Sequence, residues 1–433
     1  MKKNILSVVL LVAAQAINAQ PLSLSLQDCR RMALEYDESV KTASSDVEKA
    51  KLDREIAFAQ RLPKVDGSIT GLHTKDHDFI GLSLQTRGTY LAGINVVMPL
   101  YTGGQLTAAG KLTKIGQEVS EEKLRKTRMQ LISDVDNTYY SLISVRAKVK
   151  MLEAYALQMK ELYDKVQLSV NVELATTNDL LRITTKQSEV NYMLLKARNG
   201  EKLLQLALAN MIGTDFDQDI TPTDTLLQTA LSADLDEDIS ARPDLLLLQH
   251  QVKANELLVK KARSNYLPSV ALVGSYSHYD NIKLKGTMST INNNRIDINH
   301  NFSGNSPMLM LSVNVPIFHW GAELKKVKKA QLDLSDSQLQ LQQYERGMRV
   351  EVRKAILNIK DGQSMVETAT LGQKQADENL RVMREKYENQ LCTITDYLDA
   401  QSQWQQSHSN LIEAKTQLKI YETEYLRVTG RLE

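Results

Sequence analysis

The chain has 433 residues and a nearly balanced charge, with 53 Lys and Arg against 52 Asp and Glu. This balance excludes a protein built to bind nucleic acid, because no basic excess is available to neutralise phosphates. Beyond the N-terminus, no stretch approaches the roughly 20 apolar residues of a membrane-spanning helix.

Residues 1–19 are predicted to be a secretory signal peptide. Lys2 and Lys3 supply the positive start, Ile5–Ala14 the apolar core, and Ile17–Ala19 a small residue at the cleavage site. The alternative is a short N-terminal anchor. No cysteine directly follows the cleavage site, so a lipid anchor is not expected there.

The mature chain is predicted to open with a first structural repeat over residues 20–213. No proline occurs between Gly104 and Thr221, and a long stretch free of helix breakers favours long helices. After an initial helix, the predicted elements are a β-hairpin, a long helix and a return helix, at about 64–99, 104–170 and 178–212. Gly213 suits the end of the return helix.

A polar linker, or equatorial region, is predicted at 214–243, followed by a second repeat over 244–433. No proline follows Pro316. The second repeat is predicted to contain a helix, then a β-hairpin, a long helix and a return helix, at about 269–316, 321–388 and 395–429. Each long helix would measure about 100 Å at 1.5 Å per residue.

A heptad pattern in the two long helices carries the evidence for duplication. Its spacing of 4-3-4-3 is typical of a coiled coil. The first set is Leu131, Val135, Thr138, Leu142, Val145, Val149, Leu152, Ala156, Met159, Tyr163, Val166 and Val170. The second set, 217 residues later, is Met348, Val352, Ala355, Ile359, Gly362, Val366, Ala369, Gln373, Ala376, Leu380, Met383 and Tyr387. The chain is therefore predicted to consist of two copies of one long-helix unit.

Segments near the prolines alternate between apolar and other residues with a period of two. They predict four strands of about ten residues, the length of a tilted strand that crosses a bilayer. The four segments are Val65–Thr74, Gly88–Met98, Ser269–His278 and Met308–Val315. The alternative is a soluble pair of hairpins packed on the helices.

The two hairpins differ in length. Leu62-Pro63 and Leu267-Pro268 precede them at an offset of 205, whereas Pro99 and Pro316 differ by 217. The second connection is thus 12 residues longer, and loop tips absorb insertions most easily. The extra residues are predicted to form a solvent-facing turn.

Strands in lipid must form a closed barrel, because an open edge leaves backbone groups without partners. Four strands cannot close, and the smallest membrane barrels have about eight. Copies of the chain must therefore combine, with eight strands from a dimer or twelve from a trimer. The same arrangement would place the long helices in a ring.

Three features resemble the TolC-type outer-membrane efflux channel family over almost the whole mature chain. One is the Leu-Pro pair before each hairpin, and another is the Pro-Leu/Ile-Tyr/Phe-x-x-Gly segment after it, ending at Gly104 and Gly321. The third is the helix tip from Tyr387 to Asp399. The chain departs from the family where Glu173 and Gln390 replace a tip glycine, and where Cys392 replaces an arginine common in that family.

The resemblance implies a mainly α fold with a small membrane β part. A long coiled-coil α-barrel would continue into a β-barrel shared by a homotrimer in the outer membrane. The implied partners are a periplasmic adaptor protein, an inner-membrane pump and outer-membrane lipid. The implied location is the cell outer membrane, with a large periplasmic portion.

The family's closed state is held at the periplasmic helix tips, and the matching positions here are Tyr387, Asp396, Asp399 and Asp179. Asp396 and Asp399 are three residues apart, so they share a helix face and would form rings of carboxylates in a trimer. Simpler interpretations remain open. The aspartates near a first turn also suit helix capping, and Tyr387 also suits packing in the heptad seam.

The predicted function is the exit duct of a tripartite efflux or type I secretion system. It would passively conduct what an inner-membrane pump supplies and open at the helix tips. The alternative is a soluble periplasmic coiled-coil adaptor or tether. No catalytic motif is present, so an enzyme is not expected, and neither a metal nor another cofactor is predicted. Cys29 and Cys392 are expected to be unpaired.

Overall fold

The computed structural model describes residues 22–79, 82–86, 88–216, 218–224, 235–289 and 295–433. The predicted signal peptide lies outside the described residues. The chain divides into two compact units, which we call the helical unit and the strand unit. The helical unit comprises the chain up to Ser44, Glu122–Leu246 and Gln343–Glu433. The strand unit comprises Ser45–Glu121 and Leu247–Gln342.

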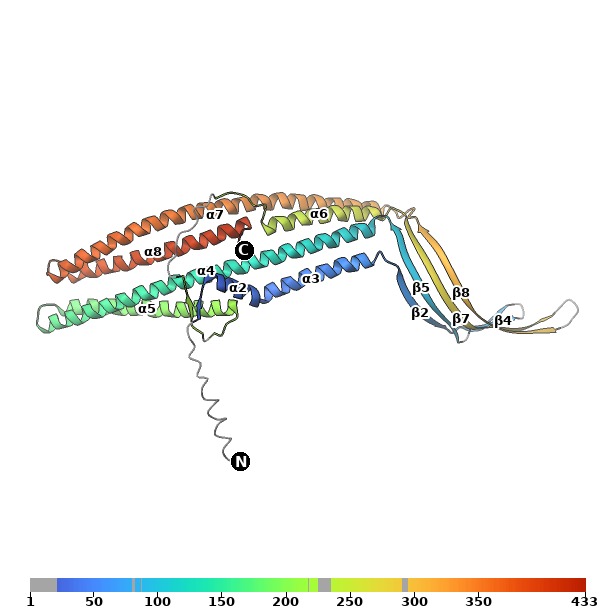
Figure 1. Cartoon of the computed structure of the whole chain (residues 1–433), viewed down its shortest axis with the longest axis horizontal. Helices are drawn as coiled ribbons and strands as arrows, with labels where there is room; N and C mark the ends of the chain where they lie inside the picture. The colour runs from blue at the N-terminus through green and yellow to red at the C-terminus, as the bar shows by residue number, and fades with distance from the viewer. Residues whose placement is uncertain (1–21, 80–81, 87, 217, 225–234, 290–294) are drawn as a thin grey trace, which may run out of the picture. The chain divides into compact units, whose positions relative to one another are not determined.

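The main helices of the two repeats have equal lengths. Helices α4 (Gln105–Asn171) and α7 (Ala322–Glu388) have 67 residues each, and α5 (Thr177–Ile212) and α8 (Ile394–Thr429) have 36 each. Both pairs begin 217 positions apart, which is the offset of the heptad pattern. Within each repeat the second helix runs back along the first (Figure 1). The predicted fold class, mainly helical with two repeats and a small β part, is confirmed.

Shorter helices precede each hairpin. They are α2 (Leu26–Tyr36), α3 (Glu38–Ala59) and α6 (Pro243–Ser264). A capping box between Ser25 and Asp28 starts α2, and Pro243 occupies the first position of α6, where its missing N–H has no helical acceptor to lose. In the described chain, no helix combines the length and apolar character needed to cross a membrane.

The heptad seam forms the core of the helical unit. Of its 24 positions, none is exposed, and Val135, Leu142, Val352 and Ile359 are fully buried. Burial of each such side chain contributes about 1.5–3 kcal/mol. Near the turns at the ends of α4 and α7, one cluster joins both repeats, since Leu152 and Met159 pack with Leu380 and Tyr397. The two repeats are therefore held together by the surface that the sequence pattern marked as apolar.

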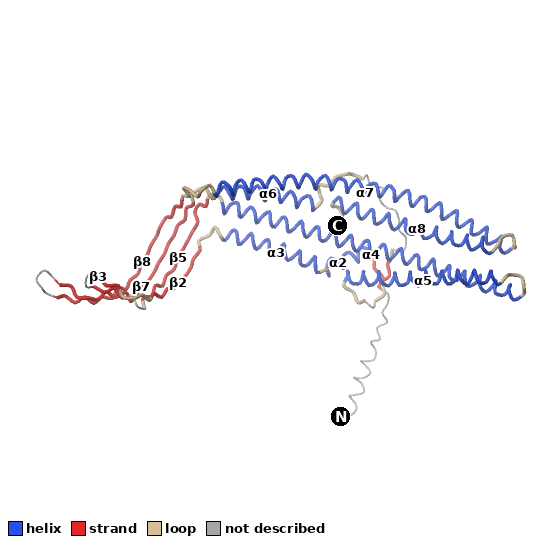
Figure 2. The backbone as a smooth tube through the Cα atoms, turned by 180° about the vertical axis from the view of Figure 1, so that it is seen from behind, coloured by secondary structure: helices blue, strands red, loops and turns tan. Residues whose placement is uncertain are grey.

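The strand unit contains an antiparallel sheet in which four strands lie side by side in the order β2-β5-β7-β8 (Figure 2). Their bounds are Lys64–Leu72, Thr89–Thr102, Ser269–Ser289 and Arg295–Asn314. Two short strands, β3 (His77–Phe79) and β4 (Leu82–Gln85), extend the sheet, with β4 paired to β7 beyond the end of β5. Among the described residues, the outer edges of β2 and β8 have no strand partner.

The prediction of four strands of about ten residues was wrong for the second hairpin, where β7 has 21 residues and β8 has 20. The additional 12 residues do not form only a turn, because most of them continue the two strands. A register shift lies between Tyr279 and Ile282, and Asn281 adopts a positive φ of 65°. This β-bulge lets β7 continue although the alternation of its side chains is interrupted.

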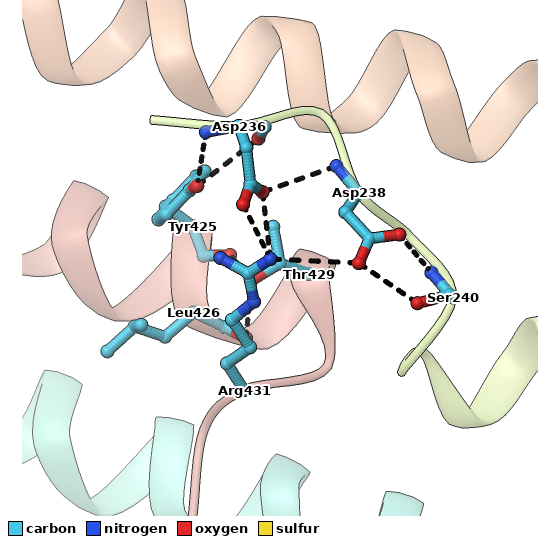
Figure 3. Close-up of polar contacts among 7 residues, drawn as sticks. All are labelled: Asp236, Asp238, Ser240, Tyr425, Leu426, Thr429 and Arg431. Atoms are coloured by element: carbon cyan, nitrogen blue, oxygen red, sulfur yellow. Dashed lines mark hydrogen bonds and ion pairs between the residues drawn. The ribbon is translucent and has the colours of Figure 1, made fainter. Parts of the chain in front are cut away.

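The linker between the repeats is held against the end of α8 (Figure 3). The Arg431 guanidinium contacts both carboxylate oxygens of Asp236 at 2.7 and 2.9 Å. The Tyr425 hydroxyl accepts a hydrogen bond from the Asp236 amide at 3.0 Å, and Asp238 accepts one from the Ser240 amide at 2.9 Å. The other end of the linker forms a parallel pair of short strands, β1 (Leu22–Leu24) and β6 (Ile220–Pro222). The equatorial region is therefore anchored at both described ends.

Candidate functional site

One face of the sheet, which we call the apolar face, is built from all four long strands. The register places Val65 beside Val96, Ile94 beside Tyr276, and Leu272 beside Leu311. Because side chains alternate along a strand, these pairs share one face. Its principal members are Val65, Ile69, Ile94, Val96, Leu272, Tyr276, Leu309, Leu311 and Val313.

The apolar face is exposed within a single chain. Ile69 is 83% exposed, Leu309 is 77% exposed and Leu311 is 60% exposed. A contiguous apolar surface of this kind marks an interface with another protein or with a membrane. The face therefore requires a nonpolar environment that one copy of the chain does not supply.

Aromatic side chains lie where the sheet meets the helices. Trp320 is 90% exposed and Phe318 is 67% exposed, and their ring centroids are 5.1 Å apart. Tyr101, at the end of β5, is also exposed. At the other end of the apolar face are Tyr276 and Tyr90, both exposed. Aromatic belts at both edges of an apolar band are typical of strands that cross a bilayer.

The opposite face of the same strands, which we call the serine-rich face, carries most of the polar side chains of the sheet, together with an apolar row of Val97, Val273 and Met310. Ser68 lies opposite Gly93, which pairs with Ser277, and Asn95 pairs with Ser275. Further members are Asp66, Ser269, Ser306 and Ser312. A sheet with one apolar face and one mostly polar face can separate a nonpolar medium from water.

The second candidate site is the pair of helix tips in the helical unit. Glu173 and Gln390 adopt positive φ angles of 61° and 58°, in turns that join α4 to α5 and α7 to α8. Glycine adopts this conformation without strain, whereas other residues rarely do. Glu173 and Gln390 thus keep a left-handed backbone with side chains larger than that of glycine.

Two of the predicted site residues take part in helix capping. Asp179 and Asp396 each form a capping box, in which the carboxylate accepts hydrogen bonds from the backbone and hydroxyl of Thr176 or Thr393. The threonine hydroxyl in turn accepts a hydrogen bond from the aspartate amide at 3.2 Å. The hydrogen bonds from Thr393 lower the pKa of Asp396 below its usual value. The capping interpretation is confirmed for both residues.

Tyr387 lies in the packed part of the tip. Its ring stacks on Tyr397 with centroids 5.3 Å apart and an interplanar angle of 8°. Burial, followed by the nearby Asp179 carboxylate, raises the pKa of the Tyr387 hydroxyl. The structure therefore brings Tyr387 of the second repeat close to Asp179 of the first.

Asp399 differs from the other predicted site residues. It is exposed, and its carboxylate forms no hydrogen bond or ion pair with any residue that the structure describes. The equivalent position in the first repeat is Arg182, which donates a hydrogen bond to the Thr395 hydroxyl at 2.5 Å. Tyr397 falls within the tip segment from Tyr387 to Asp399, and the 217-residue offset pairs Arg182 with Asp399. The sequence predicted neither the stack of Tyr397 on Tyr387 nor the hydrogen bond from Arg182 to Thr395.

A second link joins the two tips. The Lys165 ammonium lies 3.8 Å from the Glu388 carboxylate, so α4 and α7 are also connected by an ion pair. Both side chains are more than half exposed, and such pairs contribute about 0–1 kcal/mol each. Cys392 is half-buried in the second turn with a free thiol, and Cys29 is buried with a free thiol in the core of the helical unit.

Comparisons with known proteins agree with this arrangement. A model of the family described as "Outer membrane efflux protein" matches residues 30–214 and 235–431. The outer membrane protein OprJ of Pseudomonas aeruginosa is 20% identical over 418 residues, covering 92% of this chain and 82% of OprJ. The proteases secretion protein PrtF of Dickeya chrysanthemi is 20% identical over 430 residues, covering 94% of this chain and 88% of PrtF.

The solvent efflux pump outer membrane protein SrpC of Pseudomonas putida is 24% identical over 251 residues, or 56% of this chain. The chain spans about half the length of SrpC, at 53%. Among solved structures, VceC of Vibrio cholerae has a TM-score of 0.78 at 15% identity, covering 94% of this chain and 96% of VceC. CusC has a TM-score of 0.79 at 16% identity, covering 95% of this chain and 93% of CusC.

Proposed function

Because the chain belongs to the outer membrane efflux protein family, we propose that it is the exit duct of a tripartite efflux or type I secretion system. The protein is located in the outer membrane, with a large helical portion in the periplasm. The duct is passive and conducts what an inner-membrane pump delivers. The observation that carries the proposal is the apolar face, which four strands present together and which a single chain leaves exposed.

A homotrimer supplies the strand partners that the edges of a single chain lack. The free outer edges of β2 and β8 can pair between copies, and three copies close a twelve-stranded barrel with the apolar face toward lipid. The helical unit offers a second contact between copies, because Val350, Leu357 and Leu371 are 66%, 59% and 58% exposed on α7 at heptad spacing. A ring assembled from unlike edges is a closed heterologous oligomer.

Adjacent residues of β8 test the proposed barrel. Leu309 belongs to the apolar face, and Met310, the next residue, belongs to the serine-rich face. A lysine at a lipid-facing position near the bilayer midplane costs about 2–4 kcal/mol. Leu309→Lys should therefore reduce the trimer recovered from outer membranes, while Met310→Lys should leave trimer assembly intact and alter conductance. Equal tolerance of both substitutions would contradict a lipid-facing role for the apolar face.

At the periplasmic end, we propose that the helix tips hold the duct closed. Three Asp399 carboxylates would form a ring at the entrance, and Asp396 would support that ring by starting α8 correctly. The Arg182–Thr395 hydrogen bond and the Lys165–Glu388 ion pair would tie the first tip to the second, while the Tyr387–Tyr397 stack holds α7 against α8 within the second tip. Opening then requires these contacts between repeats to separate, while the capping boxes stay formed within each turn.

Asp399→Asn removes the proposed charge ring without touching a capping box. Single channels in planar bilayers should lose part of their cation preference, because three fixed negative charges are removed from a narrow entrance. Glu367→Gln is the matched control, since it removes one exposed carboxylate per copy on α7, about 30 Å along the helix from the tip. If both variants keep the parent's selectivity, Asp399 does not contribute to the gate.

The proposed partners are a periplasmic adaptor protein and an inner-membrane pump. SrpC is named for a solvent efflux pump and PrtF for secretion of proteases, which supports a duct whose cargo is chosen by its pump. The competing function is a soluble periplasmic tether. Membrane fractionation separates the two, because a tether would be recovered in the soluble periplasmic fraction and a duct in the outer membrane.

A further inference from the structure

The outer part of the sheet reverses the polarity of its two faces. On β8, the odd-numbered residues Pro307, Leu309, Leu311 and Val313 are apolar, and they belong to the apolar face. Beyond Gly304 the even-numbered residues become apolar instead, namely Ile296, Ile298 and Phe302, with His300 among them. The odd-numbered residues of that segment are Asp297, Asn299, Asn301 and Ser303. One strand therefore carries apolar side chains on opposite faces in its two halves.

The bulge in β7 gives this strand the same reversal of apolar and polar faces as its neighbour β8. Tyr279 pairs with Gly304, whereas Ile282 pairs with Phe302, so β7 contains one additional residue between them. Asn281 accommodates it with its positive φ of 65°. As a result Ile282 and Leu284 share a face with Phe302. Without the additional residue, Lys283 and Lys285 would take their place.

Strand β4 completes this surface. Leu84 pairs with Leu284, and Leu82 pairs with Gly286, so both leucines lie on the same face as Phe302. We call the part of the sheet beyond the bulge, formed by β4 and the ends of β7 and β8, the lobe, and we call this surface of it the inner lobe face. Its members are Leu82, Leu84, Ile282, Leu284, Ile296, Ile298 and Phe302. The opposite surface is polar and contains Ser83, Gln85, Lys283, Lys285, Asn299 and Asn301.

The inner lobe face is incompletely covered by its own chain. Ile296 is 52% exposed, Phe302 is 40% exposed and Leu84 is 39% exposed. Apolar side chains left in water forgo the free energy that burial would supply, about 25 cal/mol per Å². Paired strands whose apolar side chains all lie on one face need another surface to cover that face.

The position of the inner lobe face shows which second surface can cover it. The inner lobe face continues the serine-rich face along β8, because Phe302 and Gly304 have the same parity as Ser306 and Ser312. In the proposed trimer the serine-rich face surrounds the duct, so the inner lobe faces of the copies all turn toward the central axis. The opposite surface, which carries Lys283 and Lys285, faces away from the axis. The surfaces available at the axis are the same faces of the other copies.

We propose that the inner lobe faces of the three copies pack against one another and narrow the outer opening of the duct. This inference rests on the proposed function, since it requires the trimer. The polar outer surface of each lobe then faces water beyond the membrane. The duct consequently has a hydrophobic constriction at its outer end, in addition to the proposed periplasmic gate.

Neighbouring residues of β8 provide the test. In a Cys392→Ser background, with Cys29 left buried, Ile298→Cys places a thiol on the inner lobe face and Asn299→Cys places one on the polar surface. Mild oxidation of intact outer membranes should link Ile298→Cys into a disulfide dimer. The Asn299→Cys protein and the Cys392→Ser parent should remain monomeric on denaturing gels.

Native electrophoresis of the same samples distinguishes a failure of the proposed contact between lobes from a failure of the proposed function. Absence of a trimer would contradict the proposed function itself. A trimer in which Ile298→Cys is not linked, or is linked no more than Asn299→Cys, would overturn the contact between lobes while leaving the duct in place. Such a result would indicate that the inner lobe face meets a different partner.

A second measurement addresses the constriction. A thiol at Ser277, on the serine-rich face, should react slowly with a membrane-impermeant maleimide added to whole cells. Adding Ile298→Asp should increase the labelling rate several-fold. The three new carboxylates would repel one another and would be costly to bury, so the lobes would separate. Asn299→Asp, on the polar surface, should leave the rate unchanged. Equal rates in both charged variants would contradict a constriction formed by the inner lobe faces.

Discussion

Replacing Arg30 with Met should destabilise the helical unit by about 3–5 kcal/mol, because it leaves a buried charge without its partner. The Arg30 guanidinium on α2 donates to both carboxylate oxygens of Asp136 on α4, at 2.7 and 2.5 Å. The Asp136 side chain has no exposed surface, and the Thr423 hydroxyl of α8 donates to it at 3.1 Å. This pair therefore joins three helices from both repeats.

The double variant Arg30→Met/Asp136→Leu separates the cost of an unpaired charge from the value of the pair. Replacing a whole buried ion pair with apolar residues of similar volume is often neutral or stabilising. The Thr423 hydroxyl would lose its acceptor, at a cost of about 1–3 kcal/mol. We therefore expect the double variant to be more stable than Arg30→Met alone.

The assay is denaturation by urea of the detergent-solubilised protein, followed by the loss of helical circular dichroism. Arg31→Met is the matched control, since Arg31 lies on the same helix but its side chain is 64% exposed, and its ion pair with Asp28 is correspondingly weak. Loss of such a pair costs about 0–1 kcal/mol. Equal midpoints for Arg30→Met and Arg31→Met, or a double variant less stable than Arg30→Met, would refute a destabilisation caused by the unpaired Asp136 charge.

Three other predictions concern the helical unit. Thr393→Ala removes a capping hydroxyl and should cost about 0.5–2 kcal/mol, whereas Thr393→Ser should cost less, as measured by the midpoint of urea denaturation. Gly430→Ala should destabilise the protein, because Gly430 has φ 76° and an added Cβ would meet a backbone oxygen at 2.5 Å. Gly347→Ala, where an added Cβ meets nothing within 4 Å, should instead stabilise the protein by about 1 kcal/mol. Urea midpoints that shift in the same direction for both variants would contradict this contrast. Burial raises the pKa of Asp244, but the Lys126 ammonium 2.7 Å away and the Arg242 guanidinium together outweigh burial, so the pKa is lowered overall. Its contribution to stability is therefore present above the unfolded pKa of about 4 and is lost as pH falls through the folded value. Asp244→Asn should flatten the stability profile below about pH 4, and a profile parallel to that of the parent would argue against this contribution.

Local patterns predicted the helices well. The absence of proline and the heptad spacing placed α4 and α7 within a residue of their observed ends, because helix breakers and side-chain periodicity act over a few turns. The threonine and aspartate of each tip formed the capping boxes that their spacing allows. The sheet was harder, since β7 was expected to stop near His278. Its alternation breaks there, and a break in alternation also occurs where a bulge inserts one residue.

Contacts between distant segments could not be predicted from periodicity. The hydrogen bond from Arg182 to Thr395 and the ion pair of Lys165 with Glu388 depend on how two hairpins of the helical unit pack. The same holds for Arg30 and Asp136, which are 106 residues apart. An arginine and an aspartate on separate helices give no pattern along the chain, and only packing decides that they meet.

The sequence by itself determined the duplicated plan, the long helices and the existence of strands with one apolar side, because each of these follows from repeated local spacing. The tertiary structure decided the cross-strand register. That register alone shows that four apolar rows form one continuous face and that the polarity reverses beyond the bulge. The physical reason is that spacing along a strand shows which side chains share a face of that strand. Whether that face matches the faces of its neighbours depends on hydrogen bonds between residues far apart in the chain.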